Sequence, residues 1–208
     1  MKLQIALDEL SVEKAMRLCE ELREYIDIIE IGTPFVIREG TKAVELFAKA
    51  FPEKEVLADL KIMDAGDYES ELAFEAGAEY ATVLGVTDLL TIKGCVDAAN
   101  RYKKQSVVDL ICVDDFAKKV KELEELQVHV IAVHTGADQQ HAGRTPLEDL
   151  AEVKKLVKHA NVAVAGGINS NTIESYVALQ PDIIIVGSGI CNHATPLEEA
   201  RKIKEKML

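Results

Sequence analysis

The chain of 208 residues is 48% hydrophobic and 29% charged, and its 36 acidic and 24 basic side chains give a formal net charge of −12. This length predicts one globular domain over residues 1–208, and the negative charge excludes a general affinity for nucleic acid or for an anionic membrane surface. No apolar run approaches the ~20 residues that cross a bilayer, and the N-terminal MKLQIALDEL does not resemble a signal peptide. We expect a cytoplasmic protein with reduced thiols, because no metal-ligand spacing links the cysteines Cys19, Cys95, Cys112 and Cys191.

Short runs of β-branched and aliphatic residues alternate with segments of helical periodicity along the whole chain. We predict buried strands at residues 2–7, 27–31, 55–62, 80–84, 106–112, 128–134, 161–166 and 182–187. After the first strand, Ser11 is a candidate N-cap for a helix with an inward apolar stripe, formed by Val12, Ala15, Met16, Cys19 and Leu22. The tetrapeptide Thr-Pro-Leu-Glu occurs at 145–148 and again at 195–198. It predicts two more helix starts, each with Thr as N-cap and Glu closing a capping box.

Eight strands, each followed by a helix, divide the 208 residues into units of 26. Continuous apolar strands are typical of parallel sheets that are covered on both faces. We therefore predict the α/β class and a compact, single-domain (β/α)8 TIM barrel. An open doubly wound sheet is the alternative, but it more often has five or six strands, and no G-x-G-x-x-G follows the first strand.

Ionisable residues occur where the predicted strands should be apolar, and mostly near their carboxyl ends. Burying an unpaired charge costs several kcal/mol, so such residues need an explanation. Each alone has a simpler interpretation, as a cap or a surface residue. Because active sites of TIM barrels lie at the carboxyl ends of the strands, we expect these side chains to converge on one site. They are Asp8, Glu30, Asp59, Lys61, Asp64, Asp109 and His134.

The chemistry of these groups suggests their roles. The carboxylates of Glu30 and Asp59, on adjacent strands, are hard oxygen ligands suited to Mg²⁺. Lys61, two residues after Asp59 and on the same side of the strand, should stay protonated and stabilise negative charge on a substrate oxygen. His134 is the natural proton carrier near neutral pH.

Glycine-rich turns follow the last two strands. In TIM barrels these two loops frequently bind phosphate through backbone N–H groups, and glycine allows a close approach of the anion. The alternative is that the glycines only make tight turns. Their presence after both strands favours a phosphate site, formed by Gly166, Gly167, Gly187, Ser188 and Gly189.

The hexapeptide Asp59-Leu60-Lys61-Ile62-Met63-Asp64 matches D-x-K-x-x-D, and the chain resembles the orotidine 5′-monophosphate decarboxylase suprafamily over essentially its whole length. The nucleotide decarboxylases carry a lysine where this chain has Glu30. The chain is therefore most similar to the metal-dependent branch, which contains 3-hexulose-6-phosphate synthases and 3-keto-L-gulonate-6-phosphate decarboxylases. Asp109, Ala137 and Ala165 resemble the synthases, whereas the decarboxylases have Glu, Arg and Thr there. The decarboxylases also carry a phosphate-binding arginine where this chain has Ser188.

The resemblance implies a reversible aldol addition of formaldehyde to D-ribulose 5-phosphate through an enediolate. It also implies Mg²⁺ or Mn²⁺ as cofactor, held by Glu30 and Asp59. His134 is the preferred proton carrier, with Asp109 assisting, and which of the two abstracts the proton is left open. It further implies a homodimer in which Asp64 reaches the partner's site, although Asp64 has a simpler interpretation as a helix cap.

Two other functions stay open: a 3-keto-L-gulonate-6-phosphate decarboxylase, and a non-catalytic phosphosugar-binding barrel. The second is disfavoured because Glu30, Asp59, Lys61 and His134 are all present. The polar segment 135–144 is expected to form a lid over the substrate, with Arg144 in a salt bridge at the start of the next helix.

Overall fold

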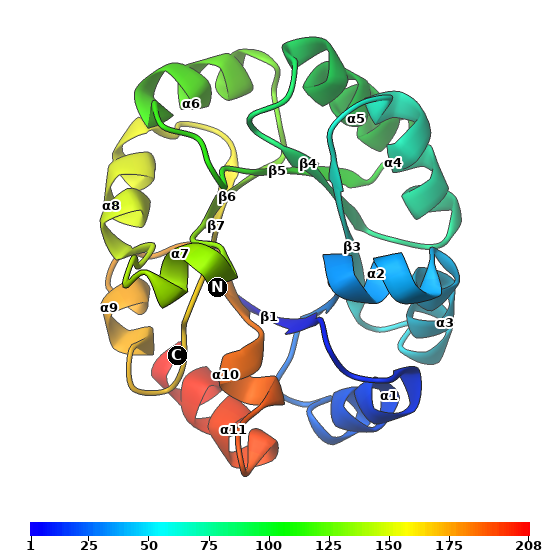
Figure 1. Ribbon diagram of the computed structural model, residues 1–208, viewed down its shortest axis with the longest axis vertical. Helices are drawn as coiled ribbons and strands as arrows, with labels where there is room; N and C mark the ends of the chain where they lie inside the picture. The colour runs from blue at the N-terminus through cyan, green and yellow to red at the C-terminus, as the bar shows by residue number, and fades with distance from the viewer.

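The computed structural model describes residues 1–208, and its strands close into a parallel barrel (Figure 1). Each strand pairs with the next one in the sequence, and the last pairs with the first. The barrel that the sequence predicts is therefore confirmed. The strands are β1 (Lys2–Leu7), β2 (Ile28–Ile31), β3 (Glu55–Ile62), β4 (Tyr80–Leu84), β5 (Gln105–Asp109), β6 (Val130–His134), β7 (Asn161–Ala165) and β8 (Ile183–Val186).

Helices form a ring around the barrel (Figure 1). The turns after β2, β6 and β8 each contain an additional short helix, α2, α7 or α10, before the helix that packs outside. None of the helices is long and apolar enough to cross a membrane. The helices are α1 (Val12–Glu21), α2 (Thr33–Glu39), α3 (Lys42–Ala50), α4 (Gly66–Glu75), α5 (Leu89–Tyr102), α6 (Phe116–Glu125), α7 (Ala137–His141), α8 (Leu147–Leu156), α9 (Ile173–Val177), α10 (Ser188–Cys191) and α11 (Pro196–Lys206).

The predicted strands agree with the structure except at their ends, and the fifth differs most. β5 ends at Asp109, whereas the apolar run predicted a strand to Cys112. The Asp109 side chain ends the strand, because its Oδ1 accepts a hydrogen bond from the N–H of Ile111 at 2.9 Å. Cys112 then has a φ of +62°, which no β-strand accommodates. Asp109 therefore lies at the end of the strand and not inside it.

The first helix start is as predicted, and the two capping boxes are wrong. Ser11 Oγ accepts the N–H of Lys14. In α8 the cap position falls on Pro146, which moves Glu148 one place too early to close a box. Thr195 does precede α11, but its hydroxyl lies 3.3 Å from His193 Nδ1 and makes no cap bond. In α8 the cap position is occupied by Pro146, which has no side-chain oxygen, and before α11 the Thr195 hydroxyl contacts His193 instead of the helix backbone.

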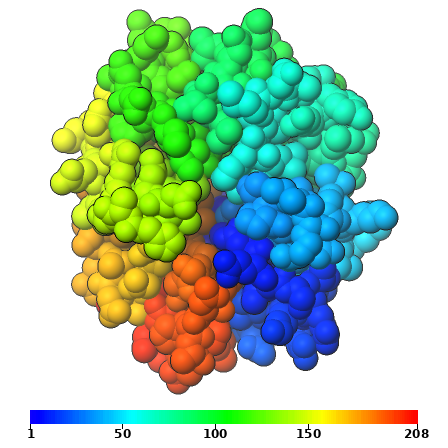
Figure 2. Space-filling model, in the orientation of Figure 1, coloured from blue at the N-terminus to red at the C-terminus, as the bar shows by residue number.

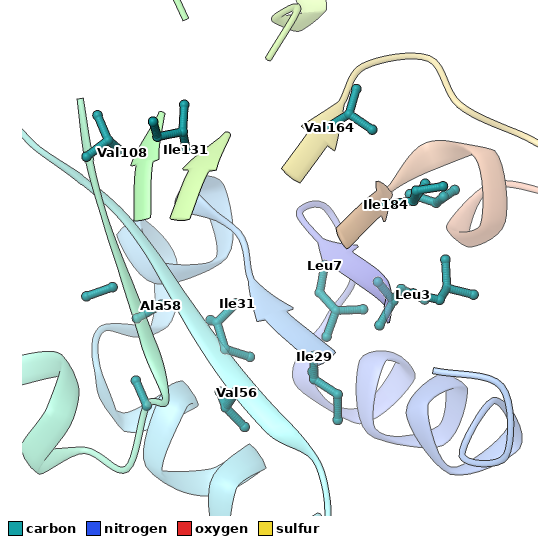
Figure 3. Packing of buried hydrophobic residues seen from close by; sticks show 14 of the residues in the cluster. Leu3, Leu7, Ile29, Ile31, Val56, Ala58, Val108, Ile131, Val164 and Ile184 are labelled. Atoms are coloured by element: carbon teal, nitrogen blue, oxygen red, sulfur yellow. The ribbon is translucent and has the colours of Figure 1, made fainter. Parts of the chain in front are cut away.

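Apolar residues form two separate layers. The larger layer lies between the strands and the helices, where Leu3, Leu7, Ile29 and Ile31 point away from the barrel axis (Figure 3). The smaller one fills the barrel interior and includes Ile28, Tyr80 and Val130. Each such side chain, fully buried, contributes roughly 1.5–3 kcal/mol of transfer free energy. The amino-terminal half of the interior is therefore packed, which leaves space only at the carboxyl ends of the strands.

Candidate active site

A cavity of about 500 Å³ opens at the carboxyl ends of the strands. Figure 2 shows the hollow at the centre of this face, bordered by α2 in blue, α7 in yellow-green and α10 in orange. Six of the ionisable residues that the sequence singles out line it, and they come from five strands or the turns directly after them. They are Asp8, Glu30, Asp59, Lys61, Asp109 and His134.

The end of β3 is irregular at Lys61. Its pairing with β4 shifts between Ala58 and Ile62, and Lys61 has a φ of +47°, in the left-handed region that non-glycine residues rarely adopt. The Lys61 N–H donates to Thr82 Oγ1 at 2.9 Å. Asp59 and Lys61 still face the same cavity, but regular strand alternation is not the reason.

Asp59 is buried and held from several sides. Thr82 Oγ1 lies 2.7 Å from its Oδ1, Thr33 Oγ1 lies 2.7 Å from its Oδ2, and Lys61 Nζ lies 2.9 Å from Oδ2. Thr33 begins α2, directly after β2, and Thr82 is on β4, so both neighbouring strands hold this carboxylate. Such contacts fix its orientation before any ligand arrives.

Asp109 connects Lys61 to His134. Its Oδ2 accepts from Lys61 Nζ at 3.0 Å and lies 2.8 Å from His134 Nδ1. Burial by itself would raise the pKa of Asp109, but the hydrogen bond and charge of His134 and the charge of Lys61 lower it to about 2. Burial likewise disfavours the charged form of Lys61, yet Asp59 and Asp109 outweigh it and raise its pKa. Asp109 and Lys61 are therefore both ionised at neutral pH.

The carboxyl groups of Glu30 and Asp8 have pKa values shifted in the opposite direction from that of Asp109. Burial and the charge of Asp59 raise the pKa of Glu30 well above its ordinary value. Burial and Asp59 also raise the pKa of Asp8. Five carboxyl groups, those of Asp8, Glu9, Glu30, Asp59 and Asp109, thus line the cavity with one ammonium group, that of Lys61, and this surplus of acidic groups favours an additional cation.

The predicted phosphate loops also line the cavity, and two of their glycines lie so close to the backbone of a neighbouring segment that a side chain would not fit. Gly166 has a φ of +128°, and a Cβ there would lie 2.7 Å from the carbonyl oxygen of Thr135. A Cβ on Gly189 would lie 2.3 Å from the carbonyl oxygen of Ile168. Gly167, Gly187 and Ser188 complete this wall. The backbone of both loops is therefore accessible from the cavity.

Asp64 is not in this cavity. It is exposed, and its Oδ1 accepts the N–H of Ala65, which itself precedes α4. The interpretation of Asp64 as the cap of that helix is wrong, because Ala65 takes the cap position with a φ of +52°. The predicted salt bridge of Arg144 is present, with Asp149 at 3.0 Å.

Other polar groups of the site were not predicted from the sequence. Thr33, Thr82 and Gln140 are common in turns, strands and helices, and nothing in their local pattern marks them. Gln140 belongs to α7 in the predicted lid segment, lines the cavity, and donates from Nε2 to the Thr135 carbonyl at 2.7 Å. Gln4 could have been singled out from the sequence, because a glutamine inside an otherwise apolar strand indicates a polar contact in the barrel.

The comparisons agree with this geometry. The family model "Orotidine 5'-phosphate decarboxylase / HUMPS family" matches residues 1–203. A 3-hexulose-6-phosphate synthase of Staphylococcus haemolyticus (strain JCSC1435) is 48% identical over 205 residues, or 99% of this chain and 98% of the relative. The crystal structure of 3-hexulose-6-phosphate synthase from Salmonella typhimurium has a TM-score of 0.98 and 54% identity, covering 100% of this chain and 98% of that one. That of 3-keto-L-gulonate-6-phosphate decarboxylase from Vibrio cholerae O1 has a TM-score of 0.87 and 25% identity, covering 99% and 96%. The chain therefore belongs to the orotidine 5′-phosphate decarboxylase / HUMPS family.

Proposed function

We propose that this chain is a 3-hexulose-6-phosphate synthase, which adds formaldehyde to D-ribulose 5-phosphate to give 3-hexulose 6-phosphate. The observation that carries the proposal is the connected group Asp59–Lys61–Asp109–His134 in the cavity, with contacts of 2.8–3.0 Å. The full-length similarity to synthases supports it, as does Ala137, a small residue lining the cavity where the related decarboxylases carry an arginine.

The residues of the site fit a divalent cation. Glu30 and Asp59 offer buried oxygen ligands from adjacent strands, and the surplus of carboxyl groups calls for positive charge. No cluster of three or more His, Cys, Asp or Glu side chains is spaced for a metal ion. Two protein ligands suit Mg²⁺ or Mn²⁺, since Mg²⁺ commonly keeps several waters. When bound, the cation would act as a Lewis acid toward the oxygens of the ketose and favour its enediolate form.

His134 is the residue that we propose to move the proton at C1. Asp109 holds its Nδ1, and no protein group is hydrogen-bonded to its Nε2. Asp109 has a pKa of about 2, so it is ionised at neutral pH and orients the imidazole, much as a carboxylate does in other acid–base pairs. Lys61 remains charged and stabilises the negative charge that forms on the substrate oxygens.

The phosphate group of the substrate would lie against the loops after β7 and β8. The backbone N–H groups near Gly166, Gly167 and Gly189 supply donors there, and Ser188 adds a hydroxyl. Asp8, on the same side of the cavity near Gly187, would accept from a sugar hydroxyl.

An apolar surface supports the proposed homodimer. Tyr68 and Leu72 lie one turn apart on α4 and are 62% and 39% exposed, and Met63 and Leu90, just before α4 and at the start of α5, are 55% and 78% exposed. Asp64 lies next to this surface and would enter the partner's site. Light scattering measures the assembly. Mixing inactive Asp64→Asn with inactive Lys61→Met should restore activity only if a site contains residues of both chains.

The proposed reaction is tested by following formaldehyde-dependent loss of ribulose 5-phosphate, with and without EDTA. Activity that depends on both formaldehyde and the cation supports the proposal. Release of CO₂ from 3-keto-L-gulonate 6-phosphate as the main activity would identify the decarboxylase instead, and no turnover of either substrate would indicate a binding protein.

The role of His134 has a separate test. His134→Asn should lower kcat by on the order of 10²–10⁴-fold and change KM little, because the proton carrier is lost while the binding groups stay. Unchanged kcat would remove His134 from the mechanism. His141→Asn is the matched control, since His141 is exposed on α7 and does not line the cavity.

A further inference from the structure

Gln4 is out of place in the packing of the barrel. Its side chain is 1% exposed and lines the bottom of the cavity. The interior side chains of such a barrel form layers, each with one residue from every second strand. The strand pairings, with a shift of two residues for each step to the next strand but one, place Gln4 in one layer with Leu57, Val107 and Ala163. Those three are apolar and belong to the interior cluster. An aliphatic residue would complete this layer, so packing does not explain a glutamine.

The two ends of the Gln4 amide have different partners. Nε2 donates to Glu30 Oε2 at 2.6 Å, from one strand to the next. No protein group donates to Oε1, although this atom is fully buried. A buried acceptor without a donor costs about 1–3 kcal/mol. The ionisable side chain in contact with Gln4 is that of Glu30, which accepts this hydrogen bond and, as a carboxylate, has no proton to donate to Oε1.

We propose that Gln4 is a positioning residue for the cation site. Its N–H group would hold one oxygen of Glu30 and leave the other for the ion, while its Oε1, after a small rotation of the side chain, would accept a hydrogen bond from a water of the ion's hydration shell. This inference rests on the proposed role of Glu30 and Asp59 as ligands. It accounts for both halves of the amide at once, and groups that orient metal ligands in this way typically change metal affinity 10–100-fold when removed.

The test compares Gln4→Met with the intact protein and with Ile28→Leu. Methionine keeps the length of the side chain and removes both hydrogen-bonding ends. Ile28 pairs with Gln4 in the β1–β2 register and lies in the interior cluster, so Ile28→Leu changes the packing of the same region without changing its polar groups. Mn²⁺ binding to the metal-free proteins, followed by the electron paramagnetic resonance signal of free Mn²⁺, gives the affinity without any substrate.

We expect Gln4→Met to weaken Mn²⁺ binding by at least 10-fold and to raise the Mg²⁺ concentration for half-maximal activity similarly. KM for ribulose 5-phosphate at saturating cation should stay within twofold, and Ile28→Leu should bind Mn²⁺ within twofold of the intact protein. Gln4→Leu provides the same comparison if the methionine variant does not fold, as judged by circular dichroism.

Three outcomes would overturn the inference. If Gln4→Met binds Mn²⁺ as the intact protein does, Gln4 has no positioning role, and the proposed function is unaffected. If Ile28→Leu loses as much affinity as Gln4→Met, the effect is one of packing. If the intact protein binds no Mn²⁺ and is active in EDTA, the ligand role of Glu30 and Asp59 is wrong, and that of Gln4 with it.

Discussion

The two ends of the barrel both contain charged side chains, but they balance them differently. At the amino-terminal end, Lys2 Nζ lies 2.6 Å from Glu55 Oε2, and Tyr80 contacts both, with its hydroxyl 3.2 Å from Lys2 Nζ and 3.0 Å from Glu55 Oε2. One cation meets one anion there. At the carboxyl end, five carboxyl groups and one ammonium group line the same cavity. The difference teaches that charged side chains at one end of a barrel are not evidence of function by themselves, whereas an unbalanced group of charges around a cavity is.

The largest expected effect distinguishes the two lysines. Lys61→Met should lower kcat/KM for ribulose 5-phosphate by roughly 10²–10³-fold, because we propose that its ammonium group stabilises charge in the transition state. Lys2→Met, the same change at the amino-terminal end of the barrel, should leave kcat/KM within twofold. The comparison between the ends fails if the two variants lose similar activity in the formaldehyde-dependent assay.

The next prediction concerns pH. The pKa of Asp109 is about 2 in the folded protein, against an ordinary value of 3.8. A lowered pKa stabilises the fold above the ordinary value, and this contribution is lost as pH falls toward 2. The shift corresponds to about 2 kcal/mol at neutral pH. The difference in free energy of unfolding between the intact protein and Asp109→Asn, measured with urea, should therefore shrink from pH 6 to pH 3. A constant difference over this range would contradict the shift.

The smallest effect is expected at the amino-terminal end of the barrel. Glu55→Gln removes one charge of the Lys2 pair, whose side chains are 43% and 35% exposed, so solvent screens the loss. We expect a loss of stability of no more than ~1 kcal/mol and full activity. Thermal unfolding measures the stability, and the formaldehyde-dependent loss of ribulose 5-phosphate measures the activity. A large loss of activity with a small loss of stability would mean that the amino-terminal end also contributes to the reaction.

Strand patterning predicted the barrel because apolar runs and turns are local features of the sequence. It also predicted six of the seven Asp, Glu, Lys and His residues that line the cavity, since the carboxyl ends of parallel strands must meet, but it did not single out Glu9. The backbone of Lys61 and the hydroxyls of Thr33 and Thr82 were not predictable, because a register shift and its partners depend on neighbouring strands. The capping boxes failed for a related reason: the proline and the nearby histidine decide what each threonine does.

The hydroxyl of Thr82 contacts both the backbone at the irregular end of β3 and the carboxylate of Asp59. Its oxygen accepts the N–H of Lys61, and its one proton is then directed at Asp59 Oδ1, 2.7 Å away. The backbone of Lys61 and the carboxylate of Asp59 are thus coupled through one oxygen atom, so a change in the position of one disturbs the other. Serine is the natural alternative at this position, while valine, equal in shape, would break both contacts together.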